Sequence, residues 1–241
     1  SQVELRILAE VTRDREFMRI FHNDLDLHMT TAQQVFGFSD RAAEDYKRLD
    51  DYKDKQNLIQ AFSSEEFENY KSVGRHRKKI KEINFGIPYG LSAFGLARRL
   101  KIPDGEAQEM LDDYFRIYRG IKQWLDRNGK ECVIKRYSKT IMGRKRFYIM
   151  PPPDDEELFR SAKRAVVRAA NNACIQGCSL DIIKLGLYYL WDAYKDLGAK
   201  LLFTVHDEII SECDADKAEQ VAAVKAELMK KAFHKHVLDV P

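Results

Sequence analysis

Residues 75–95 read RHRKKIKEINFGIPYGLSAFG and pass from basic to aromatic to glycine-rich side chains. Within this segment Arg77, Lys81, Phe85 and Tyr89 follow one another at intervals of four. Each such step advances about 40° around an α-helix, so the spacing predicts one gently wrapping stripe. Guanidinium and ammonium groups bind phosphates, and aromatic rings stack on sugars and bases. The stripe therefore suits an elongated ligand with phosphates at one end and a base at the other, although an ordinary amphipathic helix with a solvated basic start has the same pattern.

A second cluster is TVHDEII at residues 204–210, inside KLLFTVHDEIISEC at residues 200–213. Two short apolar runs around a tight turn predict a β-hairpin with Asp207 and Glu208 at its tip. Adjacent carboxylates suit Mg²⁺, which binds a few carboxylate oxygens together with phosphate oxygens. An ordinary turn that contains aspartate has the same pattern, so this segment alone leaves both interpretations open.

Arg168, Asn172 and Gln176 also follow one another at intervals of four, within VVRAANNACIQG at residues 166–177. They predict a polar stripe on a helix made otherwise of small side chains. Amide groups reach base edges and sugars, and arginine reaches phosphates or minor-groove acceptors, so the stripe suits DNA. A stripe that simply faces solvent is the alternative.

The composition of the 241 residues, with 44% hydrophobic and 33% charged side chains, is that of a globular protein. The net charge is only +3, so any affinity for nucleic acid has to come from local clusters. The four cysteines lack the spacing of a zinc site and indicate a reducing compartment. Neither an apolar run of about 18 residues nor a secretion leader is present. We therefore expect an intracellular protein without a membrane partner, in the cytoplasm or nucleoid of a bacterium, a phage-infected cell or an organelle.

Periodicity and turn residues predict helices mixed with short antiparallel strands, which is the α+β class. The opening residues alternate in polarity and predict the end of a strand that passes into a helix. Hairpins are expected around Gly143 and at residues 200–213. The expected helices cover residues 24–37, most of 40–72, 104–131, 158–196 as two helices with a bend at Gly177, and 214–235.

Taken together and in this order, the clusters resemble the motifs of the family A DNA polymerases, the DNA polymerase I type. The resemblance extends over nearly the whole chain, and YGLSAFGLARRL continues it beyond the second motif. Motif A is matched by SQVELR at residues 1–6, and motif B by Arg77, Lys81, Phe85, Tyr89 and Gly90. The helix that follows is matched by Arg168, Asn172 and Gln176, and motif C by His206, Asp207 and Glu208.

The resemblance implies an α+β palm, with an antiparallel sheet and helices, that is interrupted by mainly helical fingers. The palm is expected at residues 1–20 and 155–241, and the fingers at residues 21–154. The motif B helix is expected at about residues 75–90 and the motif C hairpin at about residues 200–213. The thumb is absent from these residues.

The implied function is template-directed DNA synthesis, in replication or repair, by two-metal nucleotidyl transfer from a dNTP to a primer 3′-OH. Two Mg²⁺ ions are implied as cofactors, with Mn²⁺ able to substitute, and primer-template DNA and dNTPs are implied as partners. A non-catalytic DNA-binding module that retains the fold is the alternative. The resemblance implies that Arg77, Lys81 and Asp207 are catalytic and that Asp207 and Glu208 bind the metal. The residues implied to bind the dNTP are Gln2, Glu4, His28, Arg77, Lys81, Phe85 and Tyr89. Those implied to bind DNA are Arg168, Asn172, Gln176 and His206.

Several features depart from the family pattern. Ser1 stands two residues after the place of the motif A aspartate, so that carboxylate and the thumb are expected on an upstream polypeptide, without which the chain is expected to be inactive. Truncation and a gene split at an intein junction both explain this start. The chain also ends short of the family's closing strand. Residues 41–72 exceed the matching segment of compact members and predict a solvated extension of the fingers. Pro88 lacks a backbone N–H and predicts a kink just before Tyr89.

Overall fold

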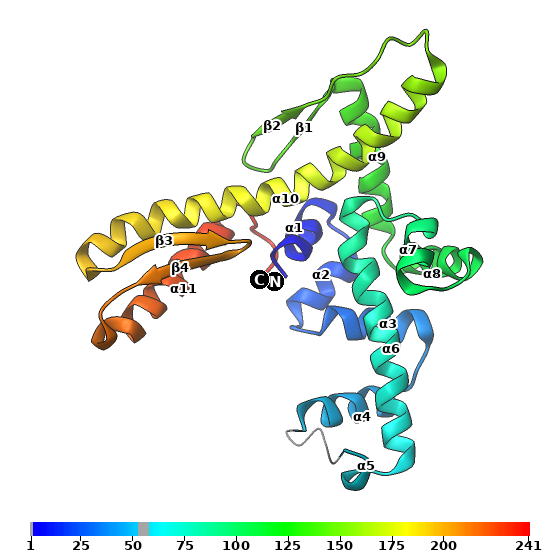
Figure 1. Cartoon of the computed structure of the whole chain (residues 1–241), viewed down its shortest axis with the longest axis horizontal. Coiled ribbons are helices and arrows are strands. Elements are labelled where there is room, and N and C mark those ends of the chain that lie inside the picture. Colours follow the sequence, from blue (N-terminus) through cyan, green and yellow to red (C-terminus); the bar gives the residue numbers. More distant parts are fainter. Residues whose placement is uncertain (1, 53–57) are drawn as a thin grey trace. The chain divides into compact units, whose positions relative to one another are not determined.

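The computed structural model describes residues 2–52 and 58–241, which separate into two compact units (Figure 1). Unit 1 contains the described residues up to Thr12 together with Trp124–Pro241, and unit 2 contains those of Arg13–Gln123. Helices with small antiparallel sheets confirm the predicted α+β class. In the described part of the chain, no helix is both long enough and apolar enough to cross a membrane.

Short polar residues begin most helices of unit 2, because a side-chain oxygen at the N-cap accepts from the first free backbone N–H groups. Asp14, Asp26, Ser39, Ser63 and Ser92 occupy these positions. The elements of the unit are α2 (Arg15–His22), α3 (Leu27–Phe36), α4 (Asp40–Asp51), α5 (Leu58–Ala61), α6 (Ser64–Gly86), η2 (Ile87–Tyr89), α7 (Ala93–Leu100), α8 (Asp104–Ile117) and the start of α9 (Arg119–Lys135).

The first two helices predicted in this unit are present with shifted ends. The helix expected at residues 24–37 is α3, which ends at Gly37 in a left-handed conformation with φ 67°. The described residues of the charged segment 40–72 include α4, α5 and the first turns of α6, and α4 packs along α6. Residues 53–57 of the predicted fingers extension lie outside the described part of the chain.

An aromatic cluster forms the centre of unit 2. The rings of Phe17 and Tyr118 meet edge to face with centroids 5.0 Å apart, and Tyr114 lies 4.8 Å from Tyr118. The Tyr118 hydroxyl and Thr31 Oγ1 are 2.6 Å apart, so the buried phenol keeps a hydrogen bond. Tyr118 also divides the helix predicted at residues 104–131 into α8 and α9, because its backbone leaves the helical conformation. The cluster thereby joins α2, α3 and α8.

Unit 1 combines helices with two separate two-stranded antiparallel sheets. β1 (Tyr137–Lys139) pairs with β2 (Lys145–Phe147), and β3 (Lys200–Val205) pairs with β4 (Glu208–Glu212). Gly143 has φ 91° and lets the first hairpin turn, as predicted. The helical elements are α1 (Val3–Thr12), the remainder of α9, α10 (Glu156–Leu197), η3 (Ala215–Lys217) and α11 (Ala218–His234).

The first described residues form helix α1, so the strand end predicted there is wrong. Leu5, Leu8, Ala9 and Thr12 are all buried and share one helix face, and Ile7 and Glu10 are buried as well. The alternating pattern that predicted a strand leaves out Leu8, and this residue completes the apolar face of a helix.

Helix α10 is continuous from Glu156 to Leu197, so the two helices with a bend at Gly177 are also wrong. Gly177 instead makes room for the β1–β2 hairpin. An added Cβ would lie 2.8 Å from Thr140 Cγ2 and 3.2 Å from Arg144 Nη2. Arg144 Nη2 donates to the Gly177 carbonyl at 2.9 Å, and both Arg144 Nε and Thr140 Oγ1 donate to the Asp181 carboxylate at 2.7 Å. The glycine therefore serves close packing.

The second hairpin is held between α10 and α11. Leu190 and Tyr194 of α10, Ile209 of β4 and Val221 of α11 form a buried cluster. The Tyr194 hydroxyl also pairs with Ser211 Oγ at 3.0 Å. These contacts fix the β3–β4 turn within unit 1.

The division between the units differs from the palm and fingers boundaries expected near residues 20 and 154. Helix α2 belongs to unit 2 because Phe17 lies in the aromatic cluster. The later part of α9 belongs to unit 1 because Asn128 Nδ2 donates to Asn171 Oδ1 of α10 at 2.8 Å, and the β1–β2 hairpin also binds α10. The names palm and fingers for these units stay predictions.

We predict that Gly177→Ala does not stabilise the protein, because the added methyl group overpacks a contact whose Thr140 side chain is fixed by Asp181, at a cost of about 1–3 kcal/mol. The gain of about 1 kcal/mol in helix propensity offsets part of this cost, so the expected net loss of stability is about 0–2 kcal/mol. The matched control is Gly105→Ala in α8, where an added Cβ has no heavy atom within 4 Å. Urea unfolding checks both variants. A stabilisation of Gly177→Ala equal to that of the control would contradict the prediction.

Candidate functional site

Helix α6 carries the basic and aromatic stripe that the sequence predicted. The helix buries Ile80 and Ile83. This orientation leaves Arg77 and Phe85 half-buried and Lys81 exposed. The three side chains, four residues apart, lie along one face of α6 with a guanidinium first, an ammonium next and a phenyl ring last.

Tyr89 lies beyond the α-helix, so the prediction of four residues on one helix is wrong for this residue. Helix α6 ends at Gly86, and η2 follows as a 3₁₀ turn in which Pro88 is the second residue. Pro88 has no backbone N–H to continue the α-helical pattern, so the change of geometry expected before Tyr89 is present. Gly90 ends the turn at φ 75°, and the Tyr89 side chain is 44% exposed.

His28 of α3 lies against the same part of α6. Its ring centroid is 5.5 Å from that of Phe85, and its Nδ1 is 2.9 Å from Nδ2 of the buried Asn84. An amide nitrogen only donates, so Nδ1 accepts and the neutral ring carries its proton on Nε2. Burial, with help from Arg77 and Lys81 and against the attraction of Asp26, lowers the pKa of His28 to about 4. The imidazole is therefore a neutral donor at pH 7.

Asp26 connects α3 with α6. One of its oxygens, Oδ1, accepts from the backbone N–H groups of His28 and Met29 at 2.9 and 3.0 Å, and so begins α3. The other oxygen, Oδ2, accepts from Arg77 Nη2 at 2.7 Å and from Nε at 3.3 Å. Partial burial raises the pKa of Asp26, but the hydrogen bonds from Arg77 and Met29 outweigh that effect and lower it. The carboxylate thus stays ionised beside Arg77.

The predicted metal-binding residues lie at the β3–β4 hairpin of unit 1. Val205 pairs with Glu208, so His206 and Asp207 form the turn and Glu208 is the first residue of β4, not part of the tip. His206 has φ 54°, a left-handed conformation that is uncommon outside glycine. The Asp207 side chain is half-buried and that of Glu208 is exposed.

These two adjacent carboxylates fit the protein's usual share of a Mg²⁺ site, since one or two carboxylates suffice when phosphates and water fill the other positions. Within residues 2–52 and 58–241, no group of three or more His, Cys, Asp or Glu side chains could hold a metal ion together.

The polar stripe on α10 is formed as expected from its spacing. Arg168 and Gln176 are exposed, and Asn172 is half-buried between them. Asn172 Nδ2 donates to Gln176 Oε1 at 3.3 Å, while Asn172 Oδ1 is buried without a hydrogen-bond partner among the described residues. The remaining predicted residues, Gln2 and Glu4, precede and open α1 in the same unit. The predicted residues therefore form two groups, one in each unit.

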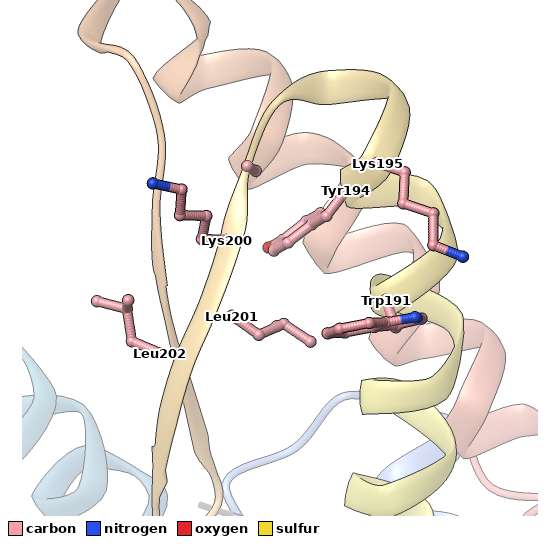
Figure 2. A pocket seen from close by; sticks show the side chains of 7 residues that line it. Trp191, Tyr194, Lys195, Lys200, Leu201 and Leu202 are labelled. Atoms are coloured by element: carbon pink, nitrogen blue, oxygen red, sulfur yellow. The ribbon is translucent and has the colours of Figure 1, made fainter.

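A cavity of about 350 Å³ lies elsewhere in unit 1, between the end of α10 and the start of β3. Figure 2 shows the rings of Trp191 and Tyr194 facing Leu201, with Lys195 and Lys200 pointing to opposite sides. None of the predicted site residues lines this cavity.

Residues 1–51 and 41–241 match the model of DNA polymerase family A. The chain belongs to DNA polymerase family A. It is 33% identical over 241 residues to the thermostable DNA polymerase I of Thermus filiformis, and 32% identical over 243 residues to DNA polymerase I of Pseudomonas aeruginosa. These matches cover 100% of this chain but only 25% and 23% of those proteins. The predicted family is thereby confirmed.

A solved structure of this family resembles the chain as well. The POL domain of Pol1 from M. smegmatis, in complex with DNA primer-template and dNTP, has a TM-score of 0.77 and 30% sequence identity. The similarity covers 100% of this chain and 36% of that one.

Two residues of this chain escaped the sequence-based prediction of the site. Asp26 lies at the start of the helix expected at residues 24–37, and nothing in the sequence places it beside Arg77. Asn84 had a usable signal, because it occupies the apolar side of α6 four residues after Ile80. A lone amide on a buried face requires a polar partner, and His28 is that partner.

We predict that His28 makes the folded protein less stable as the pH falls from about 6.5 to about 4. In that range the unfolded imidazole, with its ordinary pKa of 6.5, binds a proton that the folded one excludes. Above pH 6.5 this contribution to stability is fully present. The free energy of unfolding in urea should therefore fall less between pH 7 and pH 4.5 for His28→Gln than for the wild type. The residual loss includes His76, whose pKa burial also lowers.

The control for this measurement is His22→Gln, a change at an exposed histidine of the same unit. An unchanged pH dependence in His28→Gln, equal to that of the control, would show that folding does not lower the pKa of His28.

Proposed function

We propose that this chain supplies the dNTP-binding and metal-binding residues of a DNA polymerase that extends a primer 3′-OH on a DNA template. The observation that carries the proposal is the α6 face of Arg77, Lys81 and Phe85 beside His28, in a chain of DNA polymerase family A. The chain spans about a quarter of its curated relatives, so the activity is proposed for an enzyme that includes their other parts.

In unit 2 the order of groups along α6 matches the order of groups in a dNTP. Arg77 and Lys81 bind the triphosphate oxygens, and Lys81 donates a proton to the pyrophosphate as it leaves. The ring of Phe85 lies against the sugar and base, and Tyr89 lies beside the nascent pair. His28 adds a hydrogen bond from Nε2–H to a phosphate oxygen, which a neutral ring can donate at pH 7.

In unit 1 the carboxylates of Asp207 and Glu208 hold the metal. When bound, Mg²⁺ supplies the positive charge that activates the primer hydroxyl and steadies the leaving oxygens. Glu4 blocks the space of a ribose 2′-OH, and Gln2 contacts the triphosphate, as the family pattern indicates for these positions. Most of the rate gain then comes from positioning and from charge stabilisation.

The primer-template lies along the polar stripe of α10 and His206. Asn172 and Gln176 offer amide donors to the minor groove, where correct base pairs share similar acceptors. Such contacts test the shape of a pair without reading its sequence. Arg168 adds a contact to phosphate or to a minor-groove acceptor.

Primer extension tests this proposal, measured for the chain alone and after it is joined to the rest of a DNA polymerase I. We expect extension only from the joined protein, since the chain spans about a quarter of its relatives. Asp207→Ala should lower the extension rate of the joined protein by about 10³-fold or more, because a metal-binding carboxylate is lost. Binding of duplex DNA should stay largely intact.

The matched control is Glu212→Ala, which removes an exposed carboxylate from the far end of β4. Extension by Asp207→Ala at the rate of this control would show that the metal assignment is wrong. DNA binding without extension by the joined wild-type protein would favour the non-catalytic module.

A separate prediction concerns Phe85. In this family tyrosine at the position admits dideoxynucleotides and phenylalanine discriminates against them. We expect the joined enzyme to reject dideoxy terminators and Phe85→Tyr to incorporate them at least tenfold better relative to dNTPs. Phe94→Tyr, at an exposed ring of α7, is the control. Equal discrimination by Phe85→Tyr and wild type, measured in terminator competition, would argue against placing Phe85 at the sugar.

A further inference from the structure

The carboxylate of Asp26 divides its two oxygens between two tasks. Oδ1 begins α3 through the N–H groups of His28 and Met29, and Oδ2 binds both Nη2 and Nε of Arg77. Arg77 thus places two guanidinium nitrogens on one carboxylate oxygen, and the same N–H groups can donate to phosphate oxygens. The contact on Oδ2 can be lost while the helix cap on Oδ1 is kept.

The ion pair between Asp26 and Arg77 is accessible to solvent. The side chain of Arg77 is 29% exposed and that of Asp26 is 47% exposed. An ion pair exposed to this extent contributes little to folding, since water screens it and both side chains lose freedom. Exchange of Asp26 for another anion therefore costs the fold little.

The surroundings of Arg77 favour such an exchange toward a highly charged ligand. Lys81 lies one turn further along the same helix face. The neutral His28 lies in the first turn of α3, next to the end that Asp26 caps. Asp50 of α4 also attracts Arg77, so its negative charge opposes an incoming anion and has to be outweighed by Lys81. A triphosphate meets Arg77 and Lys81 together, whereas Asp26 offers one unit charge to Arg77 alone.

We propose that Asp26 is a built-in counter-anion of the triphosphate site: it holds Arg77 when no nucleotide is bound, and a phosphate oxygen displaces it when the triphosphate binds. The proposal rests on the proposed function, which makes Arg77 a phosphate ligand. Asp26 is thus a positioning residue that sets the affinity for the triphosphate through Arg77.

The test compares the binding of inorganic triphosphate to the 241-residue wild type and to Asp26→Asn by titration calorimetry. Asparagine begins helices as well as aspartate does, so the cap is kept while the negative charge is lost. Removing the competing charge should tighten triphosphate binding roughly three- to tenfold at low salt, and the gain should shrink at high salt. Damage to the fold would weaken binding, so the expected direction separates the proposal from a merely structural role.

Glu106→Gln is the matched control, because Glu106 accepts from Lys79 of the same helix α6 at 2.9 Å and lies off the stripe. Its affinity for triphosphate should change much less than that of Asp26→Asn. Arg77→Ala should bind triphosphate more weakly than the wild type. If Arg77→Ala binds triphosphate more weakly but Asp26→Asn binds it no more tightly than the wild type, the role of Asp26 as counter-anion is wrong and the nucleotide site stands. Absence of triphosphate binding to the wild type, or equal binding by Arg77→Ala, would overturn both the counter-anion and the proposed nucleotide site.

Discussion

Burial of one face of helix α6 determines where the charged side chains of its opposite face lie. Ile80 and Ile83 are completely buried, and each contributes about 1.5–3 kcal/mol as it leaves water. An exposed ion pair such as that of Arg77 with Asp26 contributes about 0–1 kcal/mol. Hydrophobic packing therefore sets the rotation of the helix, and the cations follow from it. The same rotation brings Asn84 to His28 and orients the ring, while burial lowers the pKa of the imidazole and keeps it neutral.

In unit 1, packing around helix α10 likewise determines where the predicted site residues lie. Helix α10 is continuous, Gly177 lets the β1–β2 hairpin approach it, and Asp181 fixes that hairpin through Thr140 and Arg144. The apolar contacts of Tyr194 and its neighbours then hold the β3–β4 hairpin that bears Asp207. One rigid helix thus carries the polar stripe proposed for DNA and supports the turn proposed for metal.

The sequence predicted the parts of this protein that depend on local chemistry. The α+β class, the end of α3 at Gly37, the two hairpins and the change of geometry at Pro88 all follow from side-chain periodicity and backbone freedom. Motif spacing was enough to identify the family. Some errors concern long-range packing: Gly177 has no visible partner in the sequence, and the ion pair of Asp26 joins residues 51 positions apart. Others are local, since the alternating pattern leaves Leu8 out of the face of α1 and the predicted β3–β4 turn lies one residue too late. The unit boundaries also depend on contacts with α10 that no local pattern encodes.

The central claim is that the α6 face binds a nucleoside triphosphate through Arg77 and Lys81. Acylation of lysines, read residue by residue by mass spectrometry, tests it most directly. Labelling of Lys81 should fall several-fold when dATP is added and stay unchanged when deoxyadenosine is added, because only the triphosphate covers the ammonium group. The neighbouring Lys78 is exposed off the stripe and serves as the internal standard. Equal labelling of Lys81 with and without dATP, while Lys78 behaves the same, would contradict the claim.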